Sequence, residues 1–113
     1  MAIAAAAVNQ FQTVTQVVDT SLSEVYEAPV GFVGVVLLAQ CTNLSSDTQT
    51  ITFVFRRGGT DTELLKDFPI PGNETAQLIT GKLVLETGDK LVTLGSSATD
   101  LKFVTSILET TNI

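Results

Sequence analysis

The sequence contains no histidine and no tryptophan, and it has one cysteine and one tyrosine. Without histidine it has no Ser–His–Asp or Cys–His nucleophilic site, and it lacks the commonest general base and the usual ligand of zinc, copper and non-haem iron. A single cysteine excludes an internal disulfide, and Cys41 ends an apolar run, which is typical of a small buried thiol. We therefore expect no enzymatic activity, no cofactor and no metal site.

Basic residues are also scarce. The chain has 6 Lys and Arg against 12 Asp and Glu, which gives a formal net charge of -6. Nucleic-acid binding depends on clustered Lys and Arg that displace counterions from phosphates. Here no basic residue precedes Arg56, and only Arg56 and Arg57 are adjacent. We expect neither a nucleic acid nor an anionic membrane as a partner.

Hydrophobic runs are short. The run from Val30 to Ala39 does not reach the roughly 20 residues that cross a bilayer. The opening residues, MAIAAAAV, carry no positive charge, and their apolar part is too short for a secretory signal. The sequence therefore predicts a soluble chain.

The chain is rich in β-branched residues: Thr, Val and Ile make up about a third of it. Such side chains favour sheet over helix, and turn signals recur at short intervals between segments of strand length. The fold class we predict is all-β: a single antiparallel β-sandwich, jelly-roll-like or Ig-like. The expected strands are residues 10–18, 22–27, 33–43, 48–57, 62–67, 74–79, 82–86, 89–95 and 101–109.

Two of these segments alternate clearly between apolar and polar residues. Ile51, Phe53 and Phe55 share one face of the first segment. The second segment places Leu101, Phe103 and Ile107 on one face. Since successive side chains of a strand point to opposite faces, we predict that Phe53 and Phe103 belong to the core.

The apolar segment 33–43 predicts a central strand that is covered on both faces. In a lone sandwich the second face needs cover from a loop, from the N-terminal segment or from a neighbouring subunit. We divide the chain into an N-terminal arm, residues 1–9, and a sandwich domain, residues 10–113. The arm is apolar and uncharged, and it is either a frayed tail or an extension that lies on an adjacent subunit. The candidate partner contacts are Ile3, Val8, Phe11, Arg56 and Arg57.

The remaining polar features have structural explanations. Asp61, Glu63 and Asp67 lie close together in the sequence, and a solvated strand edge is favoured over a catalytic pair or a weak Ca²⁺ site. Gly88-Asp89 resembles a turn of the cupin jelly rolls but lacks their histidines, so we predict a hairpin turn with a positive φ at Gly88. Asn43, in Asn-Leu-Ser, is predicted to lie in a turn.

Residues 25–108 resemble small structural proteins of tailed bacteriophages. The shared pattern has Tyr-x-x-Pro-x-Gly before an apolar strand, then Asn-x-Ser/Thr, Lys-Asp-x-Pro-Ile-Pro and Gly-Lys-Leu-Val-Leu-Glu-x-Gly-Asp. Each motif is generic turn chemistry, so the order of the motifs carries the resemblance. The residues that match are Tyr26, Pro29, Gly31, Asn43, Lys66, Asp67, Pro69, Pro71, Gly81, Lys82, Leu85, Glu86, Gly88 and Asp89.

The resemblance implies a virion component, a β-sandwich subunit that packs as a homo-oligomer or onto capsid, neck or tail proteins. It brings no catalytic residues. The alternative is a carbohydrate- or host-surface-binding module of a phage receptor-binding apparatus. Sugar sites usually offer aromatic platforms, and the lack of tryptophan and the single tyrosine, Tyr26, weigh against that alternative.

Overall fold

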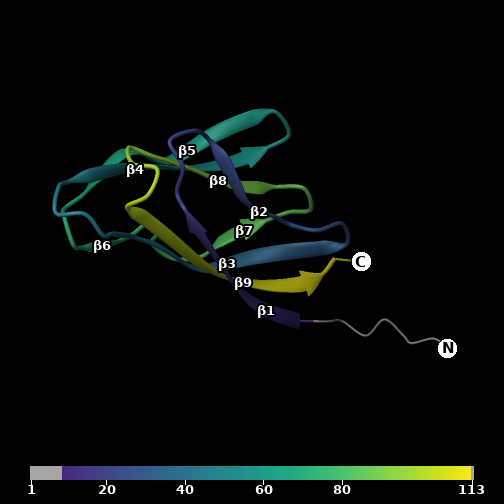
Figure 1. Ribbon diagram of the computed structural model, residues 1–113. Helices are drawn as coiled ribbons and strands as arrows, with labels where there is room; N and C mark the ends of the chain where they lie inside the picture. The colour runs from purple at the N-terminus through teal and green to yellow at the C-terminus, as the bar shows by residue number, and fades with distance from the viewer. Residues whose placement is uncertain (1–8, 113) are drawn as a thin grey trace.

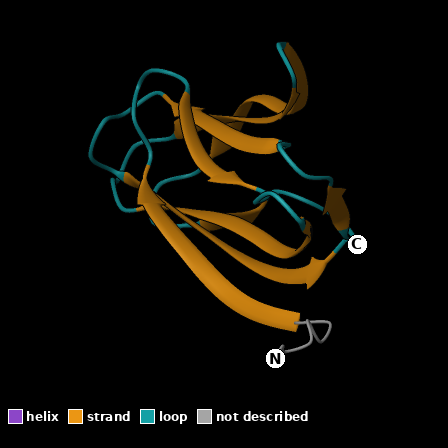
Figure 2. Cartoon of the chain, turned by 90° about the vertical axis from the view of Figure 1, so that its right-hand side faces the viewer, coloured by secondary structure: helices purple, strands orange, loops and turns teal. Residues whose placement is uncertain are grey.

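A computed structural model describes residues 9–112 of the chain and shows strands and loops only (Figures 1 and 2). No helix in this range is long and apolar enough to span a membrane. All of the predicted strands are present, with bounds that differ from the prediction by a few residues. They are β1 (Asn9–Val17), β2 (Ser23–Glu27), β3 (Phe32–Asn43), β4 (Gln49–Arg57), β5 (Thr60–Ile70), β6 (Thr75–Gln77), β7 (Leu83–Leu85), β8 (Lys90–Gly95) and β9 (Leu101–Thr111).

The strands form two antiparallel sheets that lie one above the other in Figure 1. Sheet A has the order β1-β9-β3-β6, and β7 pairs with a second part of β3, so that β6 and β7 together form one edge. Sheet B has the order β2-β8-β4-β5. The chain crosses between the sheets at every connection except β4–β5 and β6–β7. This is the strand order of a jelly roll, so the predicted sandwich is confirmed and its jelly-roll form replaces the Ig-like alternative.

The core fills the space between the sheets. Phe53 from β4 of sheet B and Phe103 from β9 of sheet A are fully buried, and their ring centroids lie 5.5 Å apart. Ile51, Leu101 and Ile107 are buried in the same cluster. The alternation in β4 and β9 therefore predicted the inward face correctly, and both phenylalanines are core residues.

Strand β3 is central, as predicted, and only its inner face is fully covered by the described residues. It is central, since β9 pairs on one side and β6 and β7 on the other, and its inward residues, such as Val36 and Cys41, are buried. Its outward residues are only partly covered, and Leu37, at a bulge in the pairing with β9, is 37% exposed. Within residues 9–112 no element lies on the outer face of sheet A. Cover by the N-terminal segment or by a neighbouring subunit therefore stays a prediction.

Two glycine turns show how the chain connects its strands. Gly58, with φ +60°, and Gly59 make the two-residue hairpin between β4 and β5. The turn at Glu86–Asp89 has the predicted positive φ at Gly88, +89°. It is not a hairpin, however, because β7 belongs to sheet A and β8 to sheet B. The turn instead carries the chain from one sheet to the other.

Candidate assembly surface

The outer face of sheet B is covered by ion pairs. Strand register places Glu27, Lys90, Arg56 and Asp61 in one row across β2, β8, β4 and β5. Arg56 Nε donates to Asp61 Oδ1 at 2.6 Å, and Lys90 Nζ donates to Glu24 Oε2 at 2.9 Å. Next to this row, Val54 and Val92 are paired and buried. Charged side chains thus shield the apolar part of this face.

Arg57 also forms an ion pair within its own domain. Its Nε and Nη2 donate to both carboxylate oxygens of Asp89, at 2.9 and 2.6 Å, and its guanidinium lies 5.2 Å from the centre of the Phe55 ring. Asp89 also accepts from the amide of Glu86 at 2.8 Å, which holds the turn between β7 and β8. Both arginines that the sequence offered as partner contacts therefore have acidic partners in their own domain.

The hydrogen bonds from Arg57 hold the pKa of Asp89 below its ordinary value, against the opposing effect of burial. A carboxylate with a lowered pKa stabilises the fold at pH values above its unfolded pKa, near 4, and this contribution disappears as the pH falls through the folded pKa. We expect Asp89→Asn to reduce the dependence of unfolding free energy on pH below about pH 4. Urea unfolding at several acidic pH values measures this, and identical profiles for parent and variant would contradict it.

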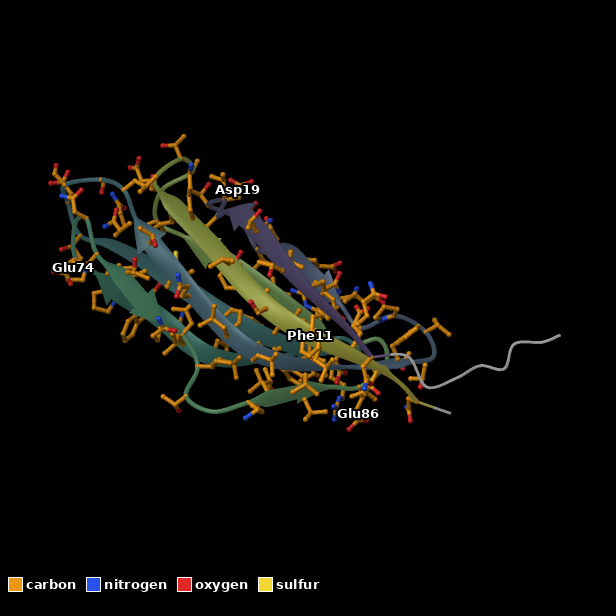
Figure 3. The ribbon with its side chains drawn as sticks, turned by 90° about the horizontal axis from the view of Figure 1, so that it is seen from below. Phe11, Asp19, Glu74 and Glu86 are labelled. Atoms are coloured by element: carbon orange, nitrogen blue, oxygen red, sulfur yellow. The ribbon has the colours of Figure 1, made fainter. Side chains whose placement is uncertain are left out.

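The outer face of sheet A has the opposite chemistry. Register aligns four apolar residues across four neighbouring strands, from β1 to β7, and we call them the apolar row: Phe11, Leu108, Val35 and Val84. Phe11 is 71% exposed and Val84 53% exposed. Figure 3 looks onto this sheet from below and labels Phe11 there. An exposed apolar group that spans a sheet is typical of an interaction surface.

The edge strands of the two sheets differ in how well they are protected against pairing with another chain. Strand β5 has bulges, charges and Pro69; β2 has a bulge and two glutamates; β6 and β7 have three residues each. These features hinder pairing with another chain. Strand β1 has nine residues, no charge, no proline and no bulge, and within residues 9–112 it pairs only with β9. The unprotected edge and the apolar row therefore belong to the same sheet.

A buried carboxylate lies at the other side of sheet A, facing the core. Glu109 of β9 is 6% exposed and accepts hydrogen bonds from the Tyr26 hydroxyl and from Gln12 Nε2, the latter at 2.6 Å. Gly34, its register partner in β3, leaves room for the phenol, because a Cβ there would lie 3.0 Å from the Tyr26 oxygen. Sequence reasoning missed this cluster, since 83 residues separate Tyr26 from Glu109.

Burial, and then the hydrogen bond to Glu109, raise the pKa of Tyr26 well above its ordinary value near 10. An acid with a raised folded pKa stabilises the fold fully below its unfolded pKa, so this contribution is lost as the pH rises above about 10. Tyr26 is the only tyrosine and the chain has no tryptophan. We expect tyrosinate absorbance at 295 nm to stay absent beyond pH 10 and to appear together with unfolding. Titration near pH 10 in a chain that is still folded would contradict this.

The acidic residues of β5 do not form a site. Asp61 is held by Arg56. Asp67 forms an ion pair with Lys66, with an N–O distance of 3.6 Å, and its backbone amide donates to Thr52 Oγ1 at 3.0 Å. Bulges interrupt the pairing of β5 with β4 beyond Glu63. Among residues 9–112, no group of three or more His, Cys, Asp or Glu side chains is placed to hold a metal ion.

An apolar opening of about 470 Å³ lies where β5 faces the segment between β6 and β7. Leucine, isoleucine and phenylalanine side chains form most of its wall, and Lys82 is its one ionisable residue. The opening therefore offers no acid–base pair. Its lining residues are Leu64, Leu65, Phe68, Gln77, Leu78, Ile79, Thr80, Lys82 and Leu83.

Of the five predicted partner contacts, Phe11 lies exposed on the outer face of sheet A, and Arg56 and Arg57 lie in ion pairs at the β4–β5 hairpin. Ile3 and Val8 lie outside the described residues. The structure therefore separates Phe11 from the two arginines, because they belong to different sheets. The pairing of β1 with β9, which aligns Phe11 with the apolar row, was not visible in the sequence.

No protein-family model matches the chain, and no curated protein matches it. Among solved structures, the chain is similar to a protein from the work "Bacillus endospore appendages form a novel family of disulfide-linked pili", with a TM-score of 0.58 and 15% sequence identity. The match covers 95% of this chain and 89% of the other. At this identity the likeness shows a common fold over nearly the whole of both chains.

Proposed function

We propose that this chain is a non-enzymatic structural subunit that assembles with copies of itself or with other structural proteins through sheet A. The contrast between the two outer faces carries this proposal. Ion pairs cover the outer face of sheet B, whereas sheet A exposes the apolar row beside an unprotected edge strand. A sandwich that stays alone in water gains nothing from such a face.

The assembly that we propose is a phage virion, with the chain as an accessory subunit of the capsid, neck or tail. The order of turn motifs in residues 25–108 supports it. These motifs lie where the chain changes direction: Gly31, Gly81 and Gly88 all have positive φ values. The similar solved structure comes from work on endospore appendages that are pili, so a fold of this kind occurs in a protein studied as part of an assembled appendage.

The contacts between copies are proposed to be non-covalent. The work on the similar structure describes disulfide-linked pili, but this chain has one cysteine. Cys41 is fully buried in β3, and burial raises the pKa of its thiol to about 12. A thiol in this state is a poor nucleophile for disulfide exchange.

Sedimentation velocity and electron microscopy of the purified chain test the proposal. We expect species larger than the 12.0 kDa monomer that grow with concentration and have a regular shape. A chain that stays monomeric and binds sugars on a glycan array would instead support the receptor-binding alternative. A sugar site of that kind needs exposed aromatic side chains, but Tyr26 is buried and Phe11 is the one exposed aromatic residue within 9–112.

A further inference from the structure

We propose that the apolar row of one copy binds the N-terminal segment, residues 3–8, of a neighbouring copy. This inference rests on the proposed structural function and names the contact that would serve it. The acceptor is Phe11, Leu108, Val35 and Val84, which lie side by side across the outer face of sheet A. Leu37, exposed on β3, adds to this apolar surface.

The donor has matching chemistry. Residues 3–8 read Ile-Ala-Ala-Ala-Ala-Val, with no charge and no polar side chain. Small side chains allow a backbone to lie close to a flat sheet, and Ile3 and Val8 provide larger apolar groups at the two ends. Charged side chains cover the outer face of sheet B. An apolar segment therefore binds more favourably to the outer face of sheet A.

The length of the segment fits the acceptor. Four neighbouring strands cover three spacings, or roughly 14 Å. An extended segment of six residues reaches about 20 Å. The segment joins the domain at Asn9, where β1 begins, two residues before Phe11. It is therefore long enough to cross the apolar row.

A neighbouring copy is a better acceptor than the same copy. To lie on its own sheet, the segment would have to reverse its direction next to β1, and tight reversals rely on Gly, Pro, Asn or Asp. Residues 1–8 contain none of these, and Asn9 is already paired with Thr110 as the first residue of β1. A segment that continues away from β1 instead reaches the next domain.

This geometry makes the contact head-to-tail. The donor and the acceptor are different surfaces of the same chain, so each copy can bind one neighbour and be bound by another. Such heterologous contacts close into a ring or continue as a filament. Face-to-face packing of two sheets A would give closed dimers instead.

Paired full-length variants test the inference. The donor variant carries Ile3→Asp and Val8→Asp, and the acceptor variant carries Val84→Asp. Thr62→Asp, on an exposed position of β5 in sheet B, is the matched control. In sedimentation velocity we expect each of the first two variants to weaken self-association at least about tenfold, because an apolar contact then buries a charge. The control should associate like the parent.

Mixing the two variants gives the decisive result. The donor variant keeps an intact acceptor and the acceptor variant keeps an intact donor, so an equimolar mixture should form heterodimers that grow no further. Equal melting temperatures of all variants would show that the domain is folded. A mixture that stays monomeric, or a donor variant that associates like the parent, would overturn the inference. The latter result would leave the proposed structural function in place, since copies would then meet through another surface.

Discussion

Phe53→Ala is expected to lower the free energy of unfolding by about 3–5 kcal/mol. Phe53 is fully buried, and its ring packs against Phe103 from the opposite sheet at a centroid distance of 5.5 Å. The substitution removes one of the contacts between the two sheets and leaves a cavity that neighbouring side chains fill only in part. Such a loss is a large share of the roughly 5–15 kcal/mol that stabilises a domain.

Denaturant unfolding monitored by circular dichroism measures this loss. Val30→Ala is the control, since Val30 is 89% exposed, lies outside the apolar row, and its truncation should change stability by less than about 0.5 kcal/mol. Phe103→Ala should cost a similar amount to Phe53→Ala. The double variant should lose less than the sum of the two, because the rings contact each other. Equal stability of Phe53→Ala and the parent would contradict the packing of the two sheets.

Asn43→Ala is the second substitution with a large expected effect, about 2–4 kcal/mol. Asn43 ends β3 and is fully buried. Its Nδ2 donates to the carbonyl oxygens of Asp47 and Ile70 at 2.8 and 2.9 Å, and its Oδ1 accepts from the amide of Ser45 at 2.9 Å. Alanine leaves these groups without their partner, and the Ile70 carbonyl among them is buried.

The same unfolding experiment tests this prediction. Thr48→Ala, an exposed position of the adjoining loop, serves as the control and should leave stability nearly unchanged. Asn43→Ser, whose side chain is too short to reach all of these groups, should also be destabilised. If Asn43→Ala unfolds together with the control, the side chain does not join the loops as described.

Much of the fold could be predicted from the sequence because local chemistry determines it. Alternation identified the inward faces of β4 and β9, and the positive φ of Gly88 was predicted from its place in a turn. Strand order could not be predicted, because it depends on pairings between distant segments, such as β1 with β9. For the same reason, Gly88 was placed in a hairpin when its turn in fact joins two sheets.

The candidate surface was predicted only in part. The apolar strand β3 indicated that something beyond the domain covers it, and its half-exposed outer residues agree with that expectation. The sequence could not show that Phe11 and Val84 lie in one row with β3, since 73 positions of chain separate them. Nor could it show that Arg57 pairs with Asp89, because Asp89 lies 32 positions away in the turn between β7 and β8.

The proposal that the chain is a structural subunit of a virion is tested most directly by quantitative mass spectrometry of purified particles. The test uses particles of a phage whose genome carries this coding sequence, separated on a density gradient. The account predicts that the chain sediments with the particles, in a constant copy ratio to the major capsid or tail protein across the fractions. Absence of the chain from purified particles, with all of it in the soluble fraction, would contradict the account.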